Sequence, residues 1–407
     1  LSGIAPHALD QTMWPGDQAG VPVFGLGRLP VDTLAQANTI VSKIIAFETA
    51  PPLNRVWGND YYSRLTFASY FEGNGTTDLR WFAETTEIVR NHALGQGYTP
   101  RRIYAASNAA NPLNWRGGAA VPAALRKPGF AWNGSTADIV AAINAGSGLV
   151  YHRDHGWWDG WGDPVFDTAD PPSIAVTGNQ FPVVFSINCA SGIFDNETVD
   201  LPANRIGSGL GIGAGYVSWS EAFLRKADGA LAIIGDTRSS STVDNNHLTL
   251  GLFDAVFPTL IPGWGGASRI ERLGDILNHG KAFLVDVASG ATPNLHPFDT
   301  GGTRPAVGNL RQEMTLYNLL GDPTVKLQLS PPWVFGRLDI VLVENRARIR
   351  VPIEPGCLTC PPELKRPELV IATAFDPRTG RQLGRSTVNE NGEALIDLGA
   401  FRGNFWV

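Results

Sequence analysis

The stretch PVVFSINCASGIF, residues 182–194, passes from an apolar run into small residues around a lone cysteine, Cys189. An apolar run without alternation is typical of a strand in a parallel sheet, because helices cover both faces of such a sheet. A second run, GLVYHRDHG at 148–156, ends in a similar way and delivers His155 and Gly156. The chain between the two runs is long enough for the crossover that parallel neighbours require. Together they predict adjacent parallel strands with a thiol and an imidazole at one sheet edge.

The rest of the first 330 residues alternates strand and helix patterns around these two runs. Apolar residues recur with the 3.6-residue rhythm of helices, and short apolar runs stand between them. This alternation predicts an α/β fold with an open, mostly parallel sheet flanked by helices. The further strands expected are RIYAAS (102–107), GALAIIG (229–235) and TVKLQL (324–329), and helices are expected to begin near Asp32, Asp78 and Ser135.

After Ser330 the pattern changes to strands joined by turns, without a helical rhythm. GRLDIVLV, ARIRVPI, ELVIATAF and EALIDLG are separated by turn sequences such as DPRTGR and NENGE. This pattern predicts a small β-sandwich of immunoglobulin type. Three domains are therefore expected: an N-terminal subdomain at 1–112, a catalytic subdomain at 113–330 and the sandwich at 331–407. The last strand, FWV, stops at residue 407, so further domains of a longer parent chain are expected.

Composition and charge argue against several classes of function. A net charge of −6 argues against nucleic-acid binding, which needs a clustered basic excess. No apolar run is long enough to span a bilayer. The chain starts with Leu1 and shows no signal peptide, which favours a processed protein that is secreted or held at the cell surface. Cys357 and Cys360 lie in a Pro-rich turn, where a local disulfide fits better than half of a zinc site.

Cys189 and His155 have the chemistry of a nucleophile and its base. The thiolate is the reactive form of cysteine, and a neighbouring imidazole can take the thiol proton and later protonate a leaving amine. The backbone N–H groups of Gly156 and Cys189 are candidates for an oxyanion hole. The competing interpretation is that Cys189 is only a small buried apolar residue, as most free cysteines are.

Residues two apart on a strand face the same side, so Arg153 should project beside His155 and Ile187 beside Cys189. Both are therefore expected to line the pocket for P1, the substrate residue before the scissile bond. A guanidinium suits a carboxylate, which predicts Asp or Glu at P1. The equal alternative is that Arg153 anchors a loop by pairing with an acid, either Asp154 or Asp236.

Several other polar and aromatic residues lie near His155 in the sequence. Trp157 and Trp161 are expected to wall the substrate cleft, with a place in the core as the alternative. His152 and His155 do not suit a metal, because residues three apart on a strand point to opposite faces. No cofactor is expected for catalysis, and a structural calcium ion is left open. GLGIGAG (209–215) lacks the strand and helix that a dinucleotide fingerprint requires.

The ordered segments of the chain resemble the caspase-like cysteine peptidases, and most closely the gingipain family. A hydrophobic strand ending in His-Gly, followed by a second ending in a small residue and Cys, is similar to the signature of this group. A trailing immunoglobulin-like module is also a feature of the family. The five similar segments are GLGRLPVDTLAQANTIVSKIIAFE (25–48), AAINAGSGLVYHRDHGWWDGWG (141–162), SINCASGIF (186–194), GALAIIGDTRSSS (229–241) and YNLLGDPTV (317–325).

The resemblance implies that Cys189 is the nucleophile, that His155 is the general base, and that Gly156 and Cys189 supply the oxyanion N–H groups. Two departures stand out. Asp154 replaces the family's glycine before the catalytic histidine, and 105–107 reads Ala-Ala-Ser where Arg-specific members carry an acid. A preference for Arg is therefore not carried over. The family also has strands before this chain's start, so the chain is expected to begin part-way into the first subdomain.

The sequence thus predicts a cysteine endopeptidase that hydrolyses protein or peptide substrates through a Cys-His dyad and an acyl-enzyme. One alternative is a catalytically decayed caspase-like module for binding or adhesion, which Asp154 keeps open. Another is a transpeptidase, in which an amine rather than water resolves the acyl-enzyme.

Overall fold

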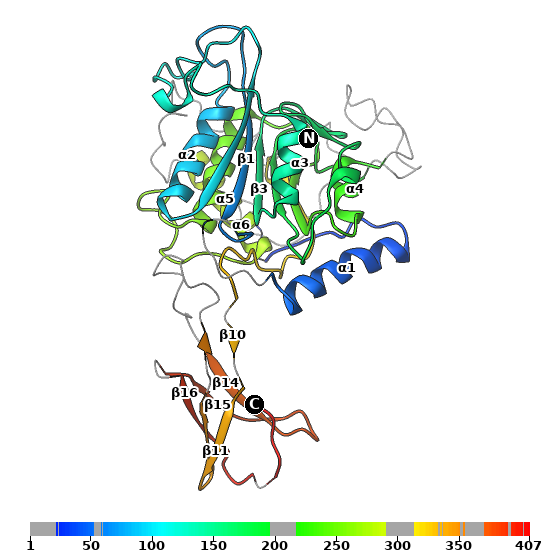
Figure 1. The fold of residues 1–407 in the computed structure, drawn as a ribbon, viewed down its shortest axis with the longest axis vertical. Helices are drawn as coiled ribbons and strands as arrows, with labels where there is room; N and C mark the ends of the chain where they lie inside the picture. Colours follow the sequence, from blue (N-terminus) through cyan, green and yellow to red (C-terminus); the bar gives the residue numbers. More distant parts are fainter. Residues whose placement is uncertain are drawn as a thin grey trace. The chain divides into compact units, whose positions relative to one another are not determined.

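The computed structural model describes residues 22, 24–52, 58, 60–195, 217–289, 313–332, 334–335, 337–350, 353–354, 370–389, 392–401 and 403–407. These residues fall into two compact units, one ending at Leu329 and one beginning at Ser330, and each is described by itself (Figure 1). No described helix is long and apolar enough to cross a membrane.

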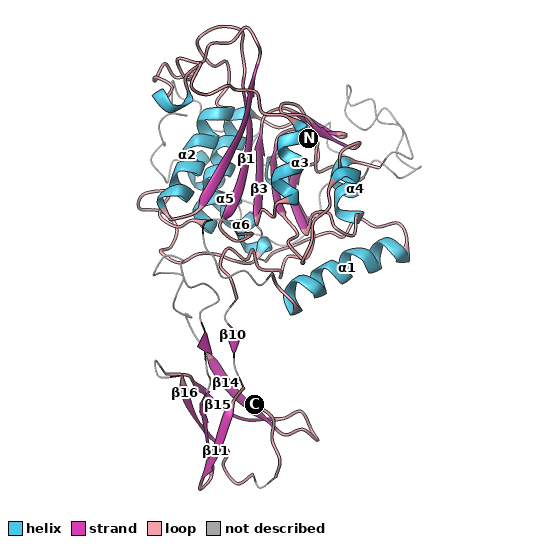
Figure 2. Cartoon of the chain, viewed as in Figure 1, coloured by secondary structure: helices cyan, strands magenta, loops and turns pink. Residues whose placement is uncertain are grey.

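A six-stranded sheet forms the centre of the first unit (Figure 2). Its first five strands are mutually parallel, and the last strand runs antiparallel to its neighbour. The predicted α/β fold with a mostly parallel sheet is therefore confirmed, and both predicted subdomains contribute strands to it. In spatial order the strands are β2 (Thr99–Ala106), β1 (Arg64–Phe71), β3 (Leu149–Arg153), β7 (Val183–Ile187), β8 (Ala232–Asp236) and β9 (Tyr317–Leu320).

The strand predicted at 324–329 is wrong. The edge strand β9 comes earlier, at Tyr317–Leu320, and the chain then turns at Gly321, whose φ is 142°. Residues Val325, Leu327 and Leu329 are buried, but only an isolated bridge joins this segment to a neighbour. Its apolar residues therefore pack as an irregular buried segment, which sequence pattern alone does not distinguish from a strand.

Helices cover both faces of the sheet (Figure 1). Ser135 caps α3, because its side chain accepts a hydrogen bond from the N–H of Asp138. The second helix begins at Phe82 rather than near Asp78, whose carboxylate instead accepts from the N–H groups of Glu72 and Arg80. On one face lie α2 (Phe82–Gly95), α5 (Thr242–Val256) and α6 (Leu273–Ser289); on the other lie α1 (Leu34–Thr49), α3 (Thr136–Asn144) and α4 (Trp219–Arg225).

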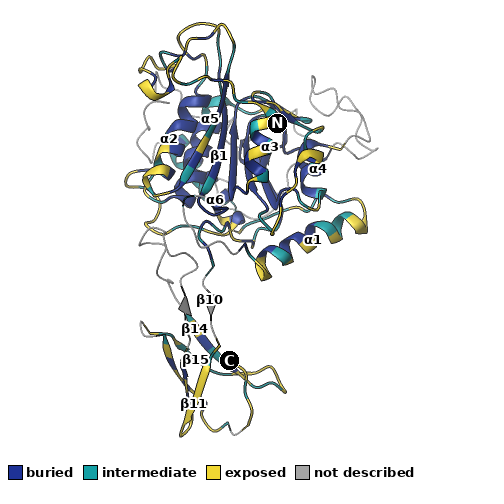
Figure 3. Cartoon of the chain, viewed as in Figure 1, coloured by how far each residue is buried: buried dark blue, intermediate teal, exposed yellow. Residues whose placement is uncertain are grey.

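The central strands β3, β7 and β8 are buried at every position (Figure 3). Burial on both faces explains why their sequences are apolar runs without alternation. On the α5 face, Tyr151 packs its ring against Phe67 and Phe253 at centroid distances of 5.8 and 5.1 Å. Such ring contacts stabilise the layer beyond simple burial of apolar area. The ends of β3 and β7 are thus held on a rigid base.

The second unit consists of short antiparallel strands. One sheet has the order β11 (Asp339–Val343), β12 (Arg346–Arg350) and β16 (Glu393–Asp397), and β14 (Ile371–Phe375) pairs with β15 (Gln382–Thr387). The two-residue strands β10 (Val334–Phe335) and β13 (Ile353–Glu354) pair with each other.

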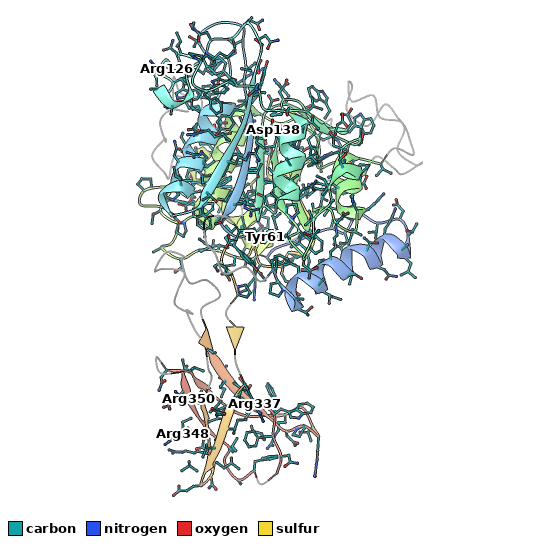
Figure 4. All side chains as sticks on the ribbon, in the orientation of Figure 1. Tyr61, Arg126, Asp138, Arg337, Arg348 and Arg350 are labelled. Atoms are coloured by element: carbon teal, nitrogen blue, oxygen red, sulfur yellow. The ribbon has the colours of Figure 1, made fainter. Side chains whose placement is uncertain are left out.

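Strand β12 alternates between the core and the solvent. Ala347 and Ile349 point into a small apolar core, while the intervening arginines, including Arg348 and Arg350, are exposed (Figure 4). The immunoglobulin type of this unit stays a prediction. Cys357 and Cys360 lie outside the described residues.

Candidate active site

The strand order reverses direction between β1 and β3, and this reversal marks one point on the edge of the sheet. The chain leaves β1 through α2 to reach β2 on one side, and it returns through α3, on the other face, to β3 on the far side of β1. Ligand sites in open α/β sheets lie at such a reversal, beyond the carboxyl ends of the two strands. Here β1 is followed by Glu72 and β3 is followed by Asp154 and His155.

His155 and Glu72 meet across this point. The Nε2 atom of His155 lies 3.0 Å from Oε2 of Glu72, which also accepts from Nε of Arg80 at 3.3 Å. The Phe82 ring packs against the imidazole in a T-shaped arrangement, with a centroid distance of 5.2 Å and an interplanar angle of 85°. The side chain of His155 remains 41% exposed. Glu72 therefore fixes the ring orientation and leaves Nδ1 as the nitrogen that can face a reacting group.

Cys189 follows the neighbouring strand at the equivalent position. Arg153 pairs with Ile187 in the β3–β7 register, so His155 and Cys189 each stand two residues beyond that pair. The Sγ atom of Cys189 lies 3.9 Å from the carbonyl oxygen of Ser240 and 4.0 Å from its Oγ. Burial, and next the negative charge of Asp236, raise the pKa of the Cys189 thiol. At neutral pH the resting thiol is thus protonated.

The turn after Cys189 is tightly held. Ala190 adopts a left-handed conformation, with φ of 55°, and its N–H donates to the carbonyl of Arg238 at 3.0 Å. This conformation is unfavourable for alanine, so the surrounding contacts must impose it. A Cβ atom on Gly192 would lie 2.5 Å from the backbone of Gly235, so only glycine permits this approach of the turn to β8. These constraints place Cys189 on a rigid turn.

Gly156 lies at the contact between the loop that follows β3 and the loop that follows β7. A Cβ atom built on it would lie 2.5 Å from the side chain of Asn188 and 2.8 Å from the carbonyl oxygen of Cys189. The loop that carries His155 therefore lies directly against the loop that carries the thiol. Among the described residues, nothing accepts a hydrogen bond from the N–H of Cys189. That group is available to a substrate oxygen.

A buried polar network supports Asn188, the residue before Cys189. Nδ2 of Asn188 donates to Nδ1 of His152 at 2.7 Å, and Ser191 donates its hydroxyl to Oδ1 of Asn188. The ring of His152 stacks on Trp161 with a centroid distance of 4.3 Å and an interplanar angle of 3°. Burial lowers the pKa of His152 to about 3, so the ring is neutral and can accept this bond. The network orients Asn188 and thereby the start of the Cys189 turn.

A model of peptidase family C25 matches residues 9–328. The chain belongs to peptidase family C25. Membership makes it a cysteine peptidase, and it confirms the resemblance to gingipains that the sequence indicates.

Solved structures with the same fold agree with the C25 assignment. The Arg-specific cysteine proteinase gingipain R (RgpB) superposes with a TM-score of 0.60 at 15% identity, over 96% of this chain and 72% of that one. A complex of the pro- and mature domains of RgpB from Porphyromonas gingivalis gives 0.57 at 17% identity, over 97% and 74%. A third structure, described as a protease, gives 0.55 at 14%, over 97% and 75%. No curated protein matches the chain.

Arg153 does not lie where a substrate carboxylate of this C25 peptidase could reach it. The residue is 1% exposed, and its guanidinium donates to two backbone carbonyls and to Asn246. Among the described residues, neither Asp154 nor Asp236 forms an ion pair with Arg153. The alternative that Arg153 anchors a loop by pairing with one of these two acids is therefore also wrong. The predicted preference for an acidic P1 residue therefore loses its geometric basis.

The other predicted pocket residues divide between surface and core. Trp157 is 47% exposed and its ring centroid lies 6.3 Å from that of His155, so its role as a wall of the substrate cleft stays a prediction. Trp161 is 2% exposed and stacks in the core on His152, so its assignment to the cleft wall is wrong. Ile187 is fully buried beneath Cys189. Among the described residues, no three His, Cys, Asp or Glu side chains are grouped to hold a metal.

Asp154, which replaces the family's glycine, has a structural partner. Its Oδ2 accepts from the N–H of Asp163 at 2.7 Å, and burial raises the pKa of the Asp154 carboxyl well above its usual range. This bond closes a small antiparallel sheet of β4 (Gly156–Trp157), β5 (Gly160–Trp161) and β6 (Phe166–Asp167). Asp154 thus turns away from the thiol and fixes the loop that presents His155.

Glu72 is the site residue that the sequence reading missed. It directly follows β1, whose sequence RLTFASYF mixes apolar and hydroxyl residues and does not stand out as a strand. The only sequence signal is an acid directly after a run that contains several β-forming residues, since the reversal of strand order beside it is known only from the structure.

Alkylation of Cys189 by iodoacetamide is expected to accelerate as pH rises, with a midpoint above that of an ordinary cysteine. Only the thiolate reacts, and burial together with Asp236 raises the thiol pKa in the free protein. The rate is measured by mass spectrometry of the Cys189 peptide at a series of pH values, with glutathione as the reference thiol. A rate already at its plateau at neutral pH would instead indicate a resting thiolate–imidazolium pair.

Proposed function

We propose that the chain is an endopeptidase in which the Cys189 sulfur attacks the scissile carbonyl carbon. His155 takes the thiol proton at Nδ1 as the S–C bond forms, and gives it to the departing amine as the C–N bond breaks. Glu72 holds Nε2 and stabilises the imidazolium that exists between these two steps. Water then hydrolyses the acyl-enzyme. The raised thiol pKa fits proton transfer that begins only when substrate is present.

The proposed oxyanion hole consists of the N–H groups of Cys189 and Gly156. The close approach of Gly156 to the Cys189 backbone supports this assignment. Two backbone donors preorganised on rigid turns stabilise the tetrahedral intermediate without reorganisation during the reaction. The substrate is a protein or peptide, no cofactor takes part, and the enzyme acts outside the cell or at its surface.

The observation that carries the proposal is the His155–Glu72 pair at the strand end adjacent to Cys189. In a catalytically decayed binding module, no function would require a partly exposed imidazole whose orientation is fixed by a carboxylate. Asp154, the residue that raised this alternative, is directed into its own hairpin and leaves the pair intact.

A peptidyl acyloxymethyl ketone tests the proposal, because it requires attack by an assisted thiol in a substrate-like geometry. We expect wild-type protein to be labelled at Cys189, His155→Ala to be labelled far more slowly, and His279→Ala, a helix histidine remote from the site in sequence, to react like wild type. Labelling is located by peptide mass spectrometry. Wild-type protein that reacts with iodoacetamide but not with the ketone would identify the decayed module.

A further inference from the structure

Two buried side chains lie just before the proposed nucleophile and base on their strands. Arg153 and Ile187 are direct partners in the β3–β7 register and lie two residues before His155 and Cys189. Both side chains therefore face the same side of the sheet as the reacting groups. Arg153 is 1% exposed and Ile187 is 0% exposed.

The guanidinium of Arg153 crosses from β3 toward the start of α5. Nη1 donates to the carbonyl of Ile187 at 3.3 Å, and Nη2 donates to the carbonyl of Thr242 at 2.9 Å and to Oδ1 of Asn246 at 3.0 Å. The head also lies 4.5 Å above the ring of Phe82. These acceptors and the aromatic face form a cradle for a guanidinium.

Phe82 links this cradle to the catalytic pair. One part of its ring contacts the imidazole of His155, and the guanidinium of Arg153 lies over the ring. The Cα atom of P1 is bonded to the carbonyl carbon that the sulfur attacks, so the P1 side chain must be accommodated beside Cys189. On this side of the sheet, the Arg153 side chain fills the interior between Phe82, Ile187 and the start of α5.

We propose that Arg153 is a built-in plug of the P1 pocket, and that it restricts this peptidase to substrates with a small P1 residue such as Gly, Ala or Ser. The inference rests on the proposed function, because it assumes attack by Cys189. Removing the Arg153 side chain opens a recess that already binds a guanidinium through carbonyl oxygens and an aromatic face. The Arg153→Ala enzyme should therefore accept a large P1 residue, and Arg best of all.

The test uses peptides that differ only at P1, with kcat/KM measured for each. Wild-type enzyme should prefer Gly, Ala or Ser over Leu, Phe and Arg by at least about tenfold, the discrimination expected when a pocket cannot hold one or more additional methylenes. In Arg153→Ala the ratio of Arg to Ala at P1 should rise by about tenfold or more. The ratio of kcat/KM values reports on the P1 pocket alone, because any change in thiol reactivity affects all peptides alike. Arg101→Ala removes an exposed arginine of β2 and should leave the profile unchanged.

A second measurement keeps the proposal testable if Arg153→Ala does not fold. Acyloxymethyl ketones with Gly, Ala, Phe or Arg at P1 are compared for their rates of labelling Cys189 in the wild-type protein, and the small P1 groups should react fastest. The proposal that Arg153 blocks the P1 pocket would be contradicted by a wild-type preference for a large P1 residue. An unchanged ratio of Arg to Ala cleavage in folded Arg153→Ala would contradict it as well. Failure of every ketone to label Cys189 would instead refute the proposed function.

Discussion

Replacing Cys189 by alanine is expected to lower kcat/KM by about four orders of magnitude or more, the effect of removing a nucleophile from a catalytic unit that works together. The loss arises because no acyl-enzyme can form, whereas substrate binding and the oxyanion donors remain. The side chain is small and half-buried, so the melting temperature should change little. Peptide cleavage followed by mass spectrometry provides the measurement.

The matched control is Ser240→Ala, which removes the hydroxyl nearest to Sγ but leaves the thiol in place. The Ser240 hydroxyl also accepts from Nδ2 of Asn245 at 2.8 Å and donates to the carbonyl of Asn188 at 3.4 Å. Since neutral hydrogen bonds contribute about 1 kcal/mol each, activity should fall by about tenfold, far less than in Cys189→Ala. Substantial peptidase activity in purified Cys189→Ala protein would show that the nucleophile has been assigned to the wrong residue.

Replacing Glu72 by glutamine is expected to reduce kcat by about 10²- to 10⁴-fold, comparable with neutralising the orienting acid of a catalytic triad. The amide preserves the size of the side chain but carries no charge to stabilise the imidazolium. KM should change little, because Glu72 contacts His155 and Arg80 rather than the substrate space.

The role of Glu72 is separated from a purely structural one by two readouts. Iodoacetamide alkylation of Cys189 should be unchanged in Glu72→Gln, since the thiol ionises without the base. Glu271→Gln, an exposed acid paired with Lys326, should retain full activity. A fall in melting temperature with kcat preserved would show that Glu72 only stabilises the fold.

The strands that could be predicted from the sequence are those that are buried on both faces of the sheet. Strands β3, β7 and β8 are covered on both faces, so their sequences are unbroken apolar runs, and the expected α/β sheet follows from them. Strand β1 was missed because Arg64, Thr66 and Ser69 interrupt its apolar residues, although Thr66 and Ser69 are buried through hydrogen bonds.

Prediction of the site failed where tertiary contacts decide accessibility. Strand alternation correctly places Arg153 on the same side as His155, but it contains no information about the start of α5, which covers the guanidinium. The same limit applies to Trp161, whose neighbours come from Ser186 and α4 as well as from its own hairpin. The sequence does not place Glu72 near His155, because the two residues are brought together only by the pairing of β1 with β3.

The parallel order of β1, β3 and β7 also sets when the enzyme can first act during its own synthesis. Glu72 and His155 are 83 residues apart, and parallel neighbours can be paired only after the intervening crossovers have formed. Pairing of this long-range kind is the slow part of folding. Until it is complete, Cys189, His155 and Glu72 are not held next to one another. We therefore expect the chain to gain peptidase activity only after β1, β3 and β7 have paired.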